Sequence, residues 1–490
     1  MANENPMMTA PREEPWREEL RKSKSARERA AIPRVEMPQL PPQQRISGNM
    51  EVNTGLSREQ ALLEATRCMD CPDPQCVTGC PVSINIPGFI KNVERGRFDE
   101  AARVIRFSSA LPAVCGRVCP QEKQCESRCI YHKMKKQPVA IGYLERFVAD
   151  DARTCGSLPE PTVPAPGAKK IAVAGSGPAG LSFAGEMARR GYDVTVFEAL
   201  HEIGGVLKYG IPEFRLPNSI VDDEIAALEN AGVRFVRDCI IGKTLTRDDL
   251  LGLGFDGLFV ASGAGLPRFM GIPGENLSGV MSSNEYLTRV NLMGAGLSGN
   301  DTPIVRGRRA VVVGGGNTAM DSVRTARRMG AEKAMIVYRR SEAEMPARVE
   351  EIAHAKEEGV EFLTLSNPVE YLGDDQGRVR AVRLQRMRLG EPDESGRRSP
   401  EPIPGAIDEI ETDMVIVSVG VSPNPLIPNS VEGLQISRRG TIEVDPQTME
   451  SSVGNLFAGG DIVRGGATVI LAMGDGRRAA AAMDAKLSAR

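Results

Sequence analysis

The sequence predicts an α/β fold with two Rossmann-like dinucleotide-binding domains, preceded by a mainly α-helical domain that is rich in cysteine. Two observations predict this architecture. A unit of strand, glycine-rich turn, helix and strand occurs at 171–197 and again at 310–338, and each such unit is typical of one nucleotide-binding domain. Eight of the ten cysteines fall between Cys68 and Cys129, and none follows Cys239.

Length and composition are those of a globular protein with two or three domains. The 490 residues include 51 glycines and only 4% aromatic residues, a balance that suits phosphate-binding loops because these need bare backbone. A net charge of −3 favours neither nucleic acid nor a membrane surface as a partner. No apolar run approaches the roughly 20 residues that span a bilayer, and 1–10 lacks a signal-peptide core. We therefore expect a cytoplasmic protein, whose cysteines are not paired as disulfides.

The first third of the chain divides into an arm, a helical domain and a linker. Residues 1–50 are rich in charge and proline and predict an irregular arm, either docked or solvated, with a short helix around Arg17–Ala30. Residues 51–157 predict short helices around cysteine loops, and 158–168 predict a Pro-rich linker. The expected helices are Ser57–Arg67 (capped by Ser57, Glu59 and Gln60), Asn92–Phe107 and Ile141–Ala152.

The first glycine-rich turn follows the predicted strand Ile171–Ala174 and matches G-x-G-x-x-G. In this pattern the first glycine makes a tight turn, the second lets the backbone approach a pyrophosphate, and the third lets the helix pack closely. Glu198 ends the next strand, 23 residues after Gly175, where a carboxylate can hold ribose hydroxyls. The alternative is a purely structural turn. The predicted dinucleotide-binding residues are Gly175, Gly177, Pro178, Ala179, Gly180 and Glu198.

The end of the chain indicates that this first dinucleotide is FAD. A strand, Asn455–Ala458, runs into Gly459, Gly460 and Asp461, and such an aspartate can bond the ribityl or phosphate portion of a flavin. Its alternative role is a helix N-cap. Ala467 and Thr468 then open the last helix, whose N-terminus would stabilise negative charge on a reduced flavin ring. We therefore predict that Gly460, Asp461, Ala467 and Thr468 contact FAD.

The second glycine-rich turn is a G-x-G-x-x-A sequence at 314–319. The next strand ends at Tyr338, and Arg339 and Arg340 follow where an NAD site carries an acid. Basic residues there suit a 2′-phosphate, so the predicted ligand is NADPH; the alternative is a solvated arginine pair. The predicted NADPH-binding residues are Gly314, Gly316, Asn317, Thr318, Ala319, Arg339 and Arg340.

The order of the motifs predicts that the NADPH-binding domain is inserted in the FAD-binding domain. The NADPH-binding domain is expected at 286–435. The FAD-binding domain is expected at 169–285 and 436–490, which the chain re-enters through a strand at Thr441–Val444.

The cysteines form two runs, with spacings C-x2-C-x4-C-x3-C-P from Cys68 and C-x3-C-x5-C-x3-C from Cys115. The first run resembles the bacterial ferredoxin pattern, in which the fourth cysteine ligates the other cluster. The same logic assigns Cys68, Cys71, Cys76 and Cys129 to one 4Fe–4S cluster. A second cluster takes Cys80, Cys119 and Cys125, with its fourth ligand open and Cys115 spare. Structural zinc and free thiols are the competing interpretations.

Together these motifs resemble the small (β) subunit of bacterial NADPH-dependent glutamate synthase. The resemblance implies the electron-input subunit of a hetero-oligomer, which oxidises NADPH at FAD and relays electrons through 4Fe–4S clusters. The acceptor would be the FMN-containing large (α) subunit, which makes glutamate from glutamine and 2-oxoglutarate. The resembling stretches are Gly55–Ala61, Cys68–Pro81, Gly204–Arg215, Glu344–Ala347 and Gly460–Asp461.

The resemblance also implies roles for residues that the motifs alone do not assign. It places Tyr209, Gly210 and Ile211 along the flavin, Gly205, Leu207 and Arg215 at FAD, and Glu344 at NADPH. The module is also similar to the front half of dihydropyrimidine dehydrogenase, in which a side-chain amide completes the second cluster. The matching position here is Glu145, a departure that leaves Cys115 or no residue as alternatives. The alternative functions are another NADPH:ferredoxin-type oxidoreductase, or a zinc-containing docking module.

Overall fold

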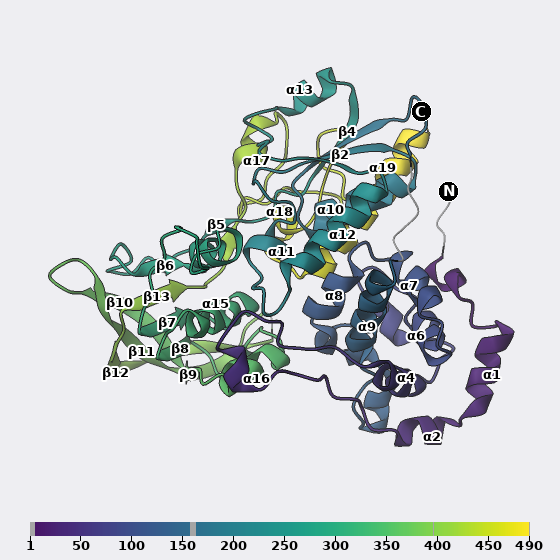
Figure 1. Ribbon diagram of the computed structural model, residues 1–490. Coiled ribbons are helices and arrows are strands. Elements are labelled where there is room, and N and C mark those ends of the chain that lie inside the picture. Colours follow the sequence, from purple (N-terminus) through teal and green to yellow (C-terminus); the bar gives the residue numbers. More distant parts are fainter. Residues whose placement is uncertain (1–4, 157–162, 395, 490) are drawn as a thin grey trace.

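The computed structural model describes residues 5–156, 163–394 and 396–489. It has three lobes, an α-helical domain and two domains built on parallel sheets (Figure 1). Residues 158–162 of the predicted linker lie outside the described residues.

The α-helical domain comes first in the chain. Ser57 caps the helix that follows it as predicted: its hydroxyl accepts from the Gln60 N–H at 3.2 Å, and the Gln60 side chain accepts from the Ser57 N–H at 2.8 Å. The domain and arm contain η1 (Pro6–Thr9), α1 (Pro15–Ser23), α2 (Ala26–Ala31), α3 (Pro42–Arg45), α4 (Arg58–Thr66), α5 (Gln75–Thr78), α6 (Ile86–Glu94), α7 (Phe98–Arg106), α8 (Pro112–Val118), η2 (Gln121–Lys123), η3 (Glu126–Arg128), η4 (Ile130–Met134) and α9 (Ile141–Thr154).

One helix prediction in this domain is wrong. The single helix expected over Asn92–Phe107 is two helices, because α6 ends at Glu94 and α7 begins at Phe98. Gly96 between them has φ +75°, a left-handed conformation that ends a helix and that glycine adopts without steric cost.

The arm is docked on the helical domain rather than solvated. The Arg17 side chain is fully buried and donates through Nε to the Asp70 carboxylate at 3.3 Å. The guanidinium carbon of Arg95 lies 3.7 Å from the centroid of the Trp16 ring. A buried, paired arginine and a covered tryptophan fix the position of α1.

The first parallel sheet has the strand order β15-β4-β1-β2-β3. Its strands are β1 (Lys170–Ala174), β2 (Asp193–Phe197), β3 (Arg234–Val236), β4 (Phe255–Val260) and β15 (Leu456–Ala458). Alternate residues of β1 enter different cores: Ile171 and Val173 pack toward the helical domain, Ala172 and Ala174 toward the opposite face. The associated helices are α10 (Pro178–Arg189), α11 (Val206–Tyr209), α12 (Asn218–Asn230), α13 (Arg247–Gly252), α17 (Leu426–Ser430), α18 (Asp461–Arg464) and α19 (Val469–Ser488).

The second parallel sheet has the strand order β6-β13-β7-β8-β9. Its strands are β6 (Val280–Ser282), β7 (Arg309–Val313), β8 (Lys333–Tyr338), β9 (Glu361–Thr364) and β13 (Met414–Val417). One face is covered by the helices α14 (Ser283–Leu287), η5 (a π-helix, Thr288–Leu292), α15 (Asn317–Arg328), η6 (Glu342–Glu344) and α16 (Val349–Glu357).

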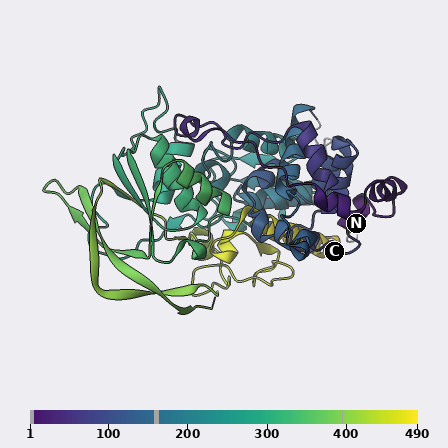
Figure 2. The ribbon, with the colours of Figure 1, turned by 90° about the horizontal axis from the view of Figure 1, so that it is seen from below.

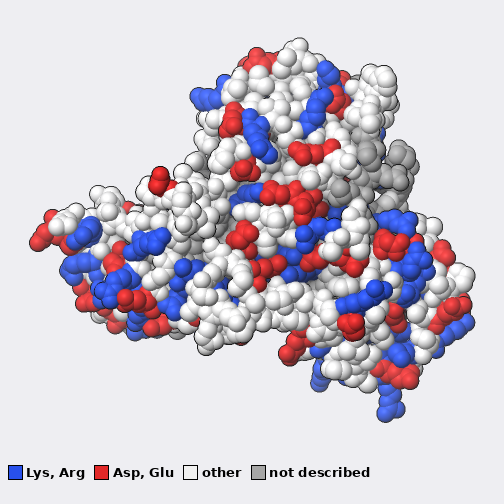
Figure 3. Space-filling model, viewed as in Figure 1, with Lys and Arg blue, Asp and Glu red and all other residues white. Residues whose placement is uncertain are grey.

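The other face of the second sheet packs on a three-stranded antiparallel sheet that the sequence analysis did not predict. It consists of β10 (Ser366–Gly373), β11 (Val379–Pro392) and β12 (Arg398–Glu411). Figure 2 shows the long strands of this sheet curving along one side of the domain. Cross-strand ion pairs, such as Arg388 with Glu401, join β11 to β12. On the face drawn in Figure 3, positive and negative side chains are interspersed over this lobe.

The two parallel-sheet domains are joined by two chain crossings. One carries β5 (Leu266–Pro267) and the other β14 (Val421–Ser422), and the two strands pair antiparallel. β6 precedes residue 286, so the second domain begins a few residues before the expected boundary. The strand expected at Thr441–Val444 is reduced to isolated bridges at Ile442 and Val444. Among the described residues, no helix combines the length and apolarity that crossing a membrane requires.

Candidate cofactor sites

The three glycines of the first turn meet different surroundings. Gly175 has φ +106°, and a Cβ there would lie 2.5 Å from the Ala261 carbonyl oxygen. A Cβ on Gly180 would lie 2.0 Å from the Gly175 carbonyl oxygen, so α10 packs on the turn only with glycine there. A Cβ on Gly177 would meet no atom within 4 Å. The first and third glycines are thus required by the chain itself, and the second faces open space that a pyrophosphate fits.

Glu198 lies against this turn, as predicted. Its side chain is 6% exposed. One carboxylate oxygen accepts from the Ser176 N–H at 2.8 Å and the other from the Leu200 N–H at 2.9 Å. Pro178 and Ala179 begin α10 beside it. The carboxylate is therefore held at the turn, at the position from which ribose hydroxyls are bound in this fold.

Tyr209 and Asp461 face the same space as Glu198. Burial raises the pKa of Tyr209 to about 12, and the negative charges of Asp461 and Glu198 add to the rise. Burial also raises the pKa of Asp461. Gly460, rather than Asp461, occupies the N-cap of α18, so the alternative role of Asp461 as an N-cap is wrong. The three residues, predicted from distant parts of the sequence, are thus close enough for the two carboxylates to raise the pKa of Tyr209.

The last helix begins beside this space. The Thr468 hydroxyl caps α19 by accepting from the Leu471 N–H at 3.4 Å. Asp475, fully buried and missed by the sequence analysis, accepts from the Gly460 N–H at 3.1 Å and from Arg464 Nε at 2.7 Å. Asp475 therefore ties α19 to the turn that precedes Asp461. An aspartate at the seventh residue of a helix has no motif that would have revealed this role.

The segment that begins with Gly205 lies across the first turn. A Cβ on Gly205 would lie 3.1 Å from the Gly177 Cα. Leu207 and Ile211 are buried, and Gly210 is half-buried. The segment is therefore packed closely against the first turn at Gly205.

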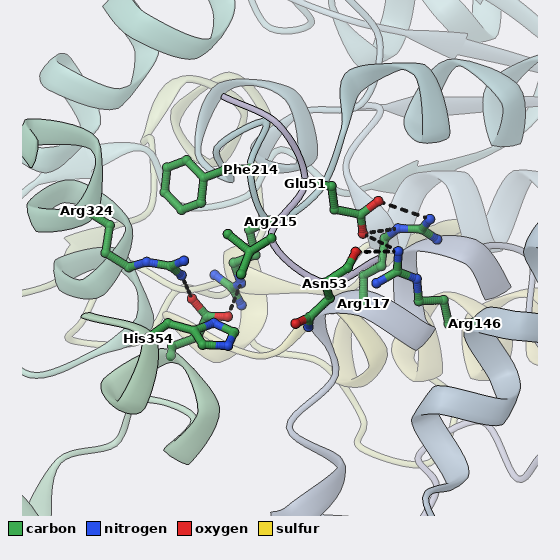
Figure 4. Close-up of a pocket in the computed structure, with 10 residues that line it drawn as sticks. Glu51, Asn53, Arg117, Arg146, Phe214, Arg215, Arg324 and His354 are labelled. Atoms are coloured by element: carbon green, nitrogen blue, oxygen red, sulfur yellow. Dashed lines mark hydrogen bonds and ion pairs between the residues drawn. The ribbon is translucent and has the colours of Figure 1, made fainter. Parts of the chain in front are cut away.

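Arg215, which the resemblance places at FAD, contacts two acidic residues of the second dinucleotide domain. Its Nη1 donates to the Asp321 carboxylate of α15 at 2.7 Å, and its Nε lies 3.7 Å from Glu351 of α16. Figure 4 shows Arg215 between Arg324 and the side chains of the helical domain. Around them is a polar cavity of about 10 Å³, the size of one water molecule. Arg215 thus joins the two dinucleotide domains.

The second glycine-rich turn opens onto a cavity of about 610 Å³. A Cβ on Gly314 would lie 2.3 Å from the Ser418 carbonyl oxygen, whereas a Cβ on Gly316 would meet no atom within 4 Å. The predicted residues Gly314, Gly316, Thr318, Arg339 and Arg340 line this cavity. A cavity of this volume is in the range of small-molecule and cofactor sites.

Three predicted residues of this site, Asn317, Ala319 and Glu344, are not among the residues that line the cavity. The Asn317 side chain accepts from the Arg348 N–H at 2.9 Å, and Ala319 is fully buried beneath the turn. Glu344 accepts from the Ser341 N–H at 3.1 Å in a capping box. Their contacts are therefore with the chain that surrounds the cavity.

The cysteines fall into the two predicted groups. Burial raises the pKa of Cys76 well above its usual value, and the neighbouring Cys68, Cys129 and Cys71 raise it further. Burial raises the pKa of Cys80 to about 12, and Glu145 and Cys119 contribute to this rise. Burial likewise raises the pKa of Cys125, with contributions from Cys80, Glu145 and Cys119. The crossed assignment thus brings together Cys68, Cys71, Cys76 and Cys129 in one group and Cys80, Cys119 and Cys125 in the other.

Glu145 lies near the second group. Its side chain is buried, one carboxylate oxygen has no hydrogen-bond partner, and burial raises its pKa to about 8. An unsatisfied buried oxygen is costly unless something binds it. Cys115 is also close, buried with its sulfur 3.4 Å from that of Met473.

Both groups supply the donors that a cluster needs. Over the described ranges, no three His, Cys, Asp or Glu side chains converge to hold a single metal ion. In a 4Fe–4S cluster, by contrast, each ligand binds a different iron. The donor set fits iron–sulfur clusters.

The loop around the second cysteine group contacts the second dinucleotide domain. Lys123 donates to the carbonyl oxygens of Pro346 at 2.9 Å and Ala347 at 3.1 Å. Arg348 donates to the Arg117 carbonyl oxygen at 2.9 Å and to the Gln121 side chain at 2.9 Å. The stretch Glu344–Ala347 therefore contacts the helical domain through Pro346 and Ala347. In the sequence, only the family resemblance singled out this stretch.

Two family models match the chain. Residues 45–157 match dihydropyrimidine dehydrogenase domain II, 4Fe–4S cluster, and residues 169–476 match pyridine nucleotide–disulphide oxidoreductase. The structure of Mycobacterium tuberculosis FprA in complex with NADPH has the same fold, at TM-score 0.55 and 21% identity over 66% of this chain and 85% of that one.

Curated relatives cover most of the sequence. The glutamate synthase (NADPH) small chain of Halomonas elongata is 38% identical over 86% of this chain and 89% of its own length. The NADP-dependent formate dehydrogenase subunit beta of Moorella thermoacetica is 38% identical over 84% of this chain and 59% of its own. The chain therefore belongs to the pyridine nucleotide–disulphide oxidoreductase family, among the glutamate synthase small chains, and is an NADPH-dependent oxidoreductase with FAD and 4Fe–4S features.

Proposed function

We propose that this chain is the electron-input subunit of a cytoplasmic glutamate synthase. It oxidises NADPH at FAD and delivers the electrons through two 4Fe–4S clusters to an FMN-containing large subunit, which makes glutamate from glutamine and 2-oxoglutarate. The flavin exchanges a hydride for single electrons, chemistry that amino-acid side chains do not supply.

The position of the second cysteine group carries this proposal. Its loops lie against α19, whose first turn faces the predicted flavin space. A Cβ on Gly474 would lie 2.9 Å from the Pro81 carbonyl oxygen, and Gln124 Nε2 donates to the Thr468 hydroxyl at 3.4 Å. Pro81 and Gln124 are each next to a cysteine of the second group. These contacts join the second group to the FAD-binding domain.

The first cysteine group lies nearer the surface. Three of its four cysteines, Cys71, Cys76 and Cys129, are half-buried, whereas in the second group only Cys80 is half-buried and Cys119 and Cys125 are buried. The arrangement supports entry of electrons next to the second group and their exit to a partner protein next to the first.

The side chains of this chain bind and orient the reactants in the proposal. Gly177 and Gly316 leave room for the two pyrophosphates, because a Cβ added at either glycine would meet no atom within 4 Å. Glu198 and Asp461 hold the ribose and ribityl hydroxyls of FAD, and Arg339 attracts the 2′-phosphate of NADPH. The proposed ligands of the second cluster are Cys80, Cys119, Cys125 and Glu145, and those of the first are Cys68, Cys71, Cys76 and Cys129.

The names of the small-chain relatives support a hetero-oligomer with a large subunit. A test combines this chain with the purified large subunit and compares Cys76→Ser with Cys155→Ser, an exposed cysteine outside both groups. We expect Cys76→Ser to retain NADPH-dependent reduction of a small dye and to lose glutamate formation. We expect Cys155→Ser to retain both activities. Coupled turnover that survives Cys76→Ser unchanged would remove the first cluster from the route.

A second candidate is an electron-transfer subunit that serves another acceptor protein. The formate dehydrogenase relative favours it, because that relative is as similar to this chain as the glutamate synthase one. Dye reduction without glutamate formation in the unsubstituted complex would support this candidate.

A further inference from the structure

The cavity at the second glycine-rich turn is lined by three arginines from two separate elements. Arg339 and Arg340 follow β8, and Arg397 lies at the tip of the β11–β12 hairpin. Of the described residues that line the cavity, these three are cationic and none is acidic. If the ligand were a dinucleotide without a 2′-phosphate, it would have no additional anionic group for Arg397 of the distant hairpin to bind.

Arg340 is already engaged by that hairpin. It is 6% exposed, and its Nε donates to the Arg398 carbonyl oxygen at 2.8 Å. Its Nη2 donates to the Asp393 carboxylate at 2.5 Å. Arg339, by contrast, is exposed. The two consecutive arginines therefore have different surroundings, one against the hairpin and one toward solvent.

Asp393 fixes the hairpin tip as well. Its N–H donates to the Arg397 carbonyl oxygen at 2.7 Å, and its carboxylate accepts from the Arg397 N–H at 3.2 Å. The same carboxylate thus holds Arg340 and the backbone of Arg397. Through Asp393, the end of β8 and the hairpin tip become one wall of the cavity.

We propose that Arg397 is a specificity-determining residue for the 2′-phosphate of NADPH, acting with Arg339. Arg340 is a positioning residue that anchors the hairpin through Asp393. The planar, permanently charged guanidinium groups suit bidentate recognition of a phosphate. The inference rests on the proposed NADPH site and adds that the antiparallel sheet takes part in cofactor choice.

The test measures binding of 2′,5′-ADP and of 5′-AMP to the intact protein by titration calorimetry. We expect Arg397→Ala to weaken 2′,5′-ADP binding by about tenfold, which corresponds to about 1.4 kcal/mol, and to leave 5′-AMP binding unchanged. Arg397→Lys keeps the charge and should retain part of the affinity. Arg388→Ala, on an exposed side chain of the same hairpin paired with Glu401, should change neither.

Arg339→Ala separates failure of this inference from failure of the site itself. If Arg339→Ala weakens 2′,5′-ADP binding and Arg397→Ala does not, the hairpin has no part in phosphate recognition. Equal losses of 2′,5′-ADP and 5′-AMP on Arg397→Ala would also overturn the inference, because they indicate a role in shaping the cavity. If neither substitution changes 2′,5′-ADP binding, the proposed NADPH site is wrong.

Discussion

The buried side chain of Glu145 has one carboxylate oxygen that forms no hydrogen bond with any described residue. Glu145 is buried beside Cys80, Cys119 and Cys125. The cost of burying an unpaired acceptor is about 1–3 kcal/mol. A bound iron would offset this cost, so Glu145 is a candidate fourth ligand; Cys115, whose side chain is hydrogen-bonded to that of Cys119, is the other.

We predict that Glu145→Ala, purified without air, loses the iron of one cluster and retains FAD. Glu145→Gln keeps an oxygen donor of the same length and should retain more iron. Iron and acid-labile sulfide per chain measure the outcome. Glu186→Gln is the matched control, a buried carboxylate of α10 that instead pairs with Arg189 at 3.0 Å. Full iron content in Glu145→Ala would exclude it as a necessary ligand.

For single residues, local backbone conformation could be predicted from the sequence, but long-range side-chain contacts could not. Glycine motifs were placed correctly because backbone geometry at the turn is local: Gly175 and Gly314 both have positive φ. The contact of Arg215 with Asp321 could not be predicted, because the two residues lie 106 positions apart in the chain. A long cationic side chain can reach several acceptors, and tertiary packing alone selects among them.

At the scale of elements, the parallel strands were predictable and the antiparallel sheet was overlooked. Strands such as β7 are buried on both faces and are continuous apolar runs. The signal for β11 was present only as short pieces of alternation, since Val379 and Ala381, and then Val382 and Leu384, are buried on either side of an exposed arginine. The register shifts of β11 against β12 interrupt strict alternation and weaken that signal.

Helices α15 and α16 are joined by a buried group of charges that gives an acid-dependent stability. Burial alone would raise the pKa of Glu358, but hydrogen bonds from Arg328 and Arg324 lower it to about 2, from an ordinary 4.5. A carboxylate with a lowered pKa stabilises the fold fully above its unfolded-state pKa. That contribution is lost as the pH falls from about 4.5 toward 2.

We predict that Glu358→Gln lowers local stability by on the order of 3 kcal/mol at pH 7, because Arg324 and Arg328 lose their buried partner. Hydrogen exchange of the α15 and α16 amides measures this, and the difference from the unsubstituted protein should shrink below pH 4.5. Glu361→Gln, an exposed residue paired with Lys333 at 3.1 Å, should change stability by less than about 1 kcal/mol. A pH-independent difference would contradict the linkage.

At the scale of the whole molecule, residues 45–53, where the arm meets the helical domain, tie the three domains together. The Val52 N–H donates to the Phe214 carbonyl oxygen at 2.9 Å, and Arg45 pairs with Glu357 at 2.6 Å. Arg146 of the helical domain donates to the Asn53 carbonyl oxygen at 2.8 Å. The number of domains, and the insertion of one dinucleotide domain in the other, could be predicted from the order of the motifs along the chain. These bracing contacts could not, because each joins residues that no local pattern relates.

Lys123 and Arg348 form the second brace, between the loop of the second cysteine group and the wall of the 610 Å³ cavity. Arg348 is 5% exposed, and Pro346 beside it lines that cavity. Removing both cations frees the second dinucleotide domain to shift relative to the flavin space. Since a displacement of about 1 Å can cost up to a hundredfold in rate, orientation should suffer before binding does.

We therefore predict that the double variant Lys123→Ala/Arg348→Ala slows NADPH-dependent flavin reduction by roughly tenfold or more, with 2′,5′-ADP binding retained. Hydrogen exchange should rise in both contacting segments, 117–125 and 345–349. Lys356→Ala is the control, because Lys356 pairs with Glu342 at the surface of the same domain. Slower flavin reduction without increased hydrogen exchange would place the effect in the cavity itself. Unchanged flavin reduction would show that this contact does not set the orientation of the domain.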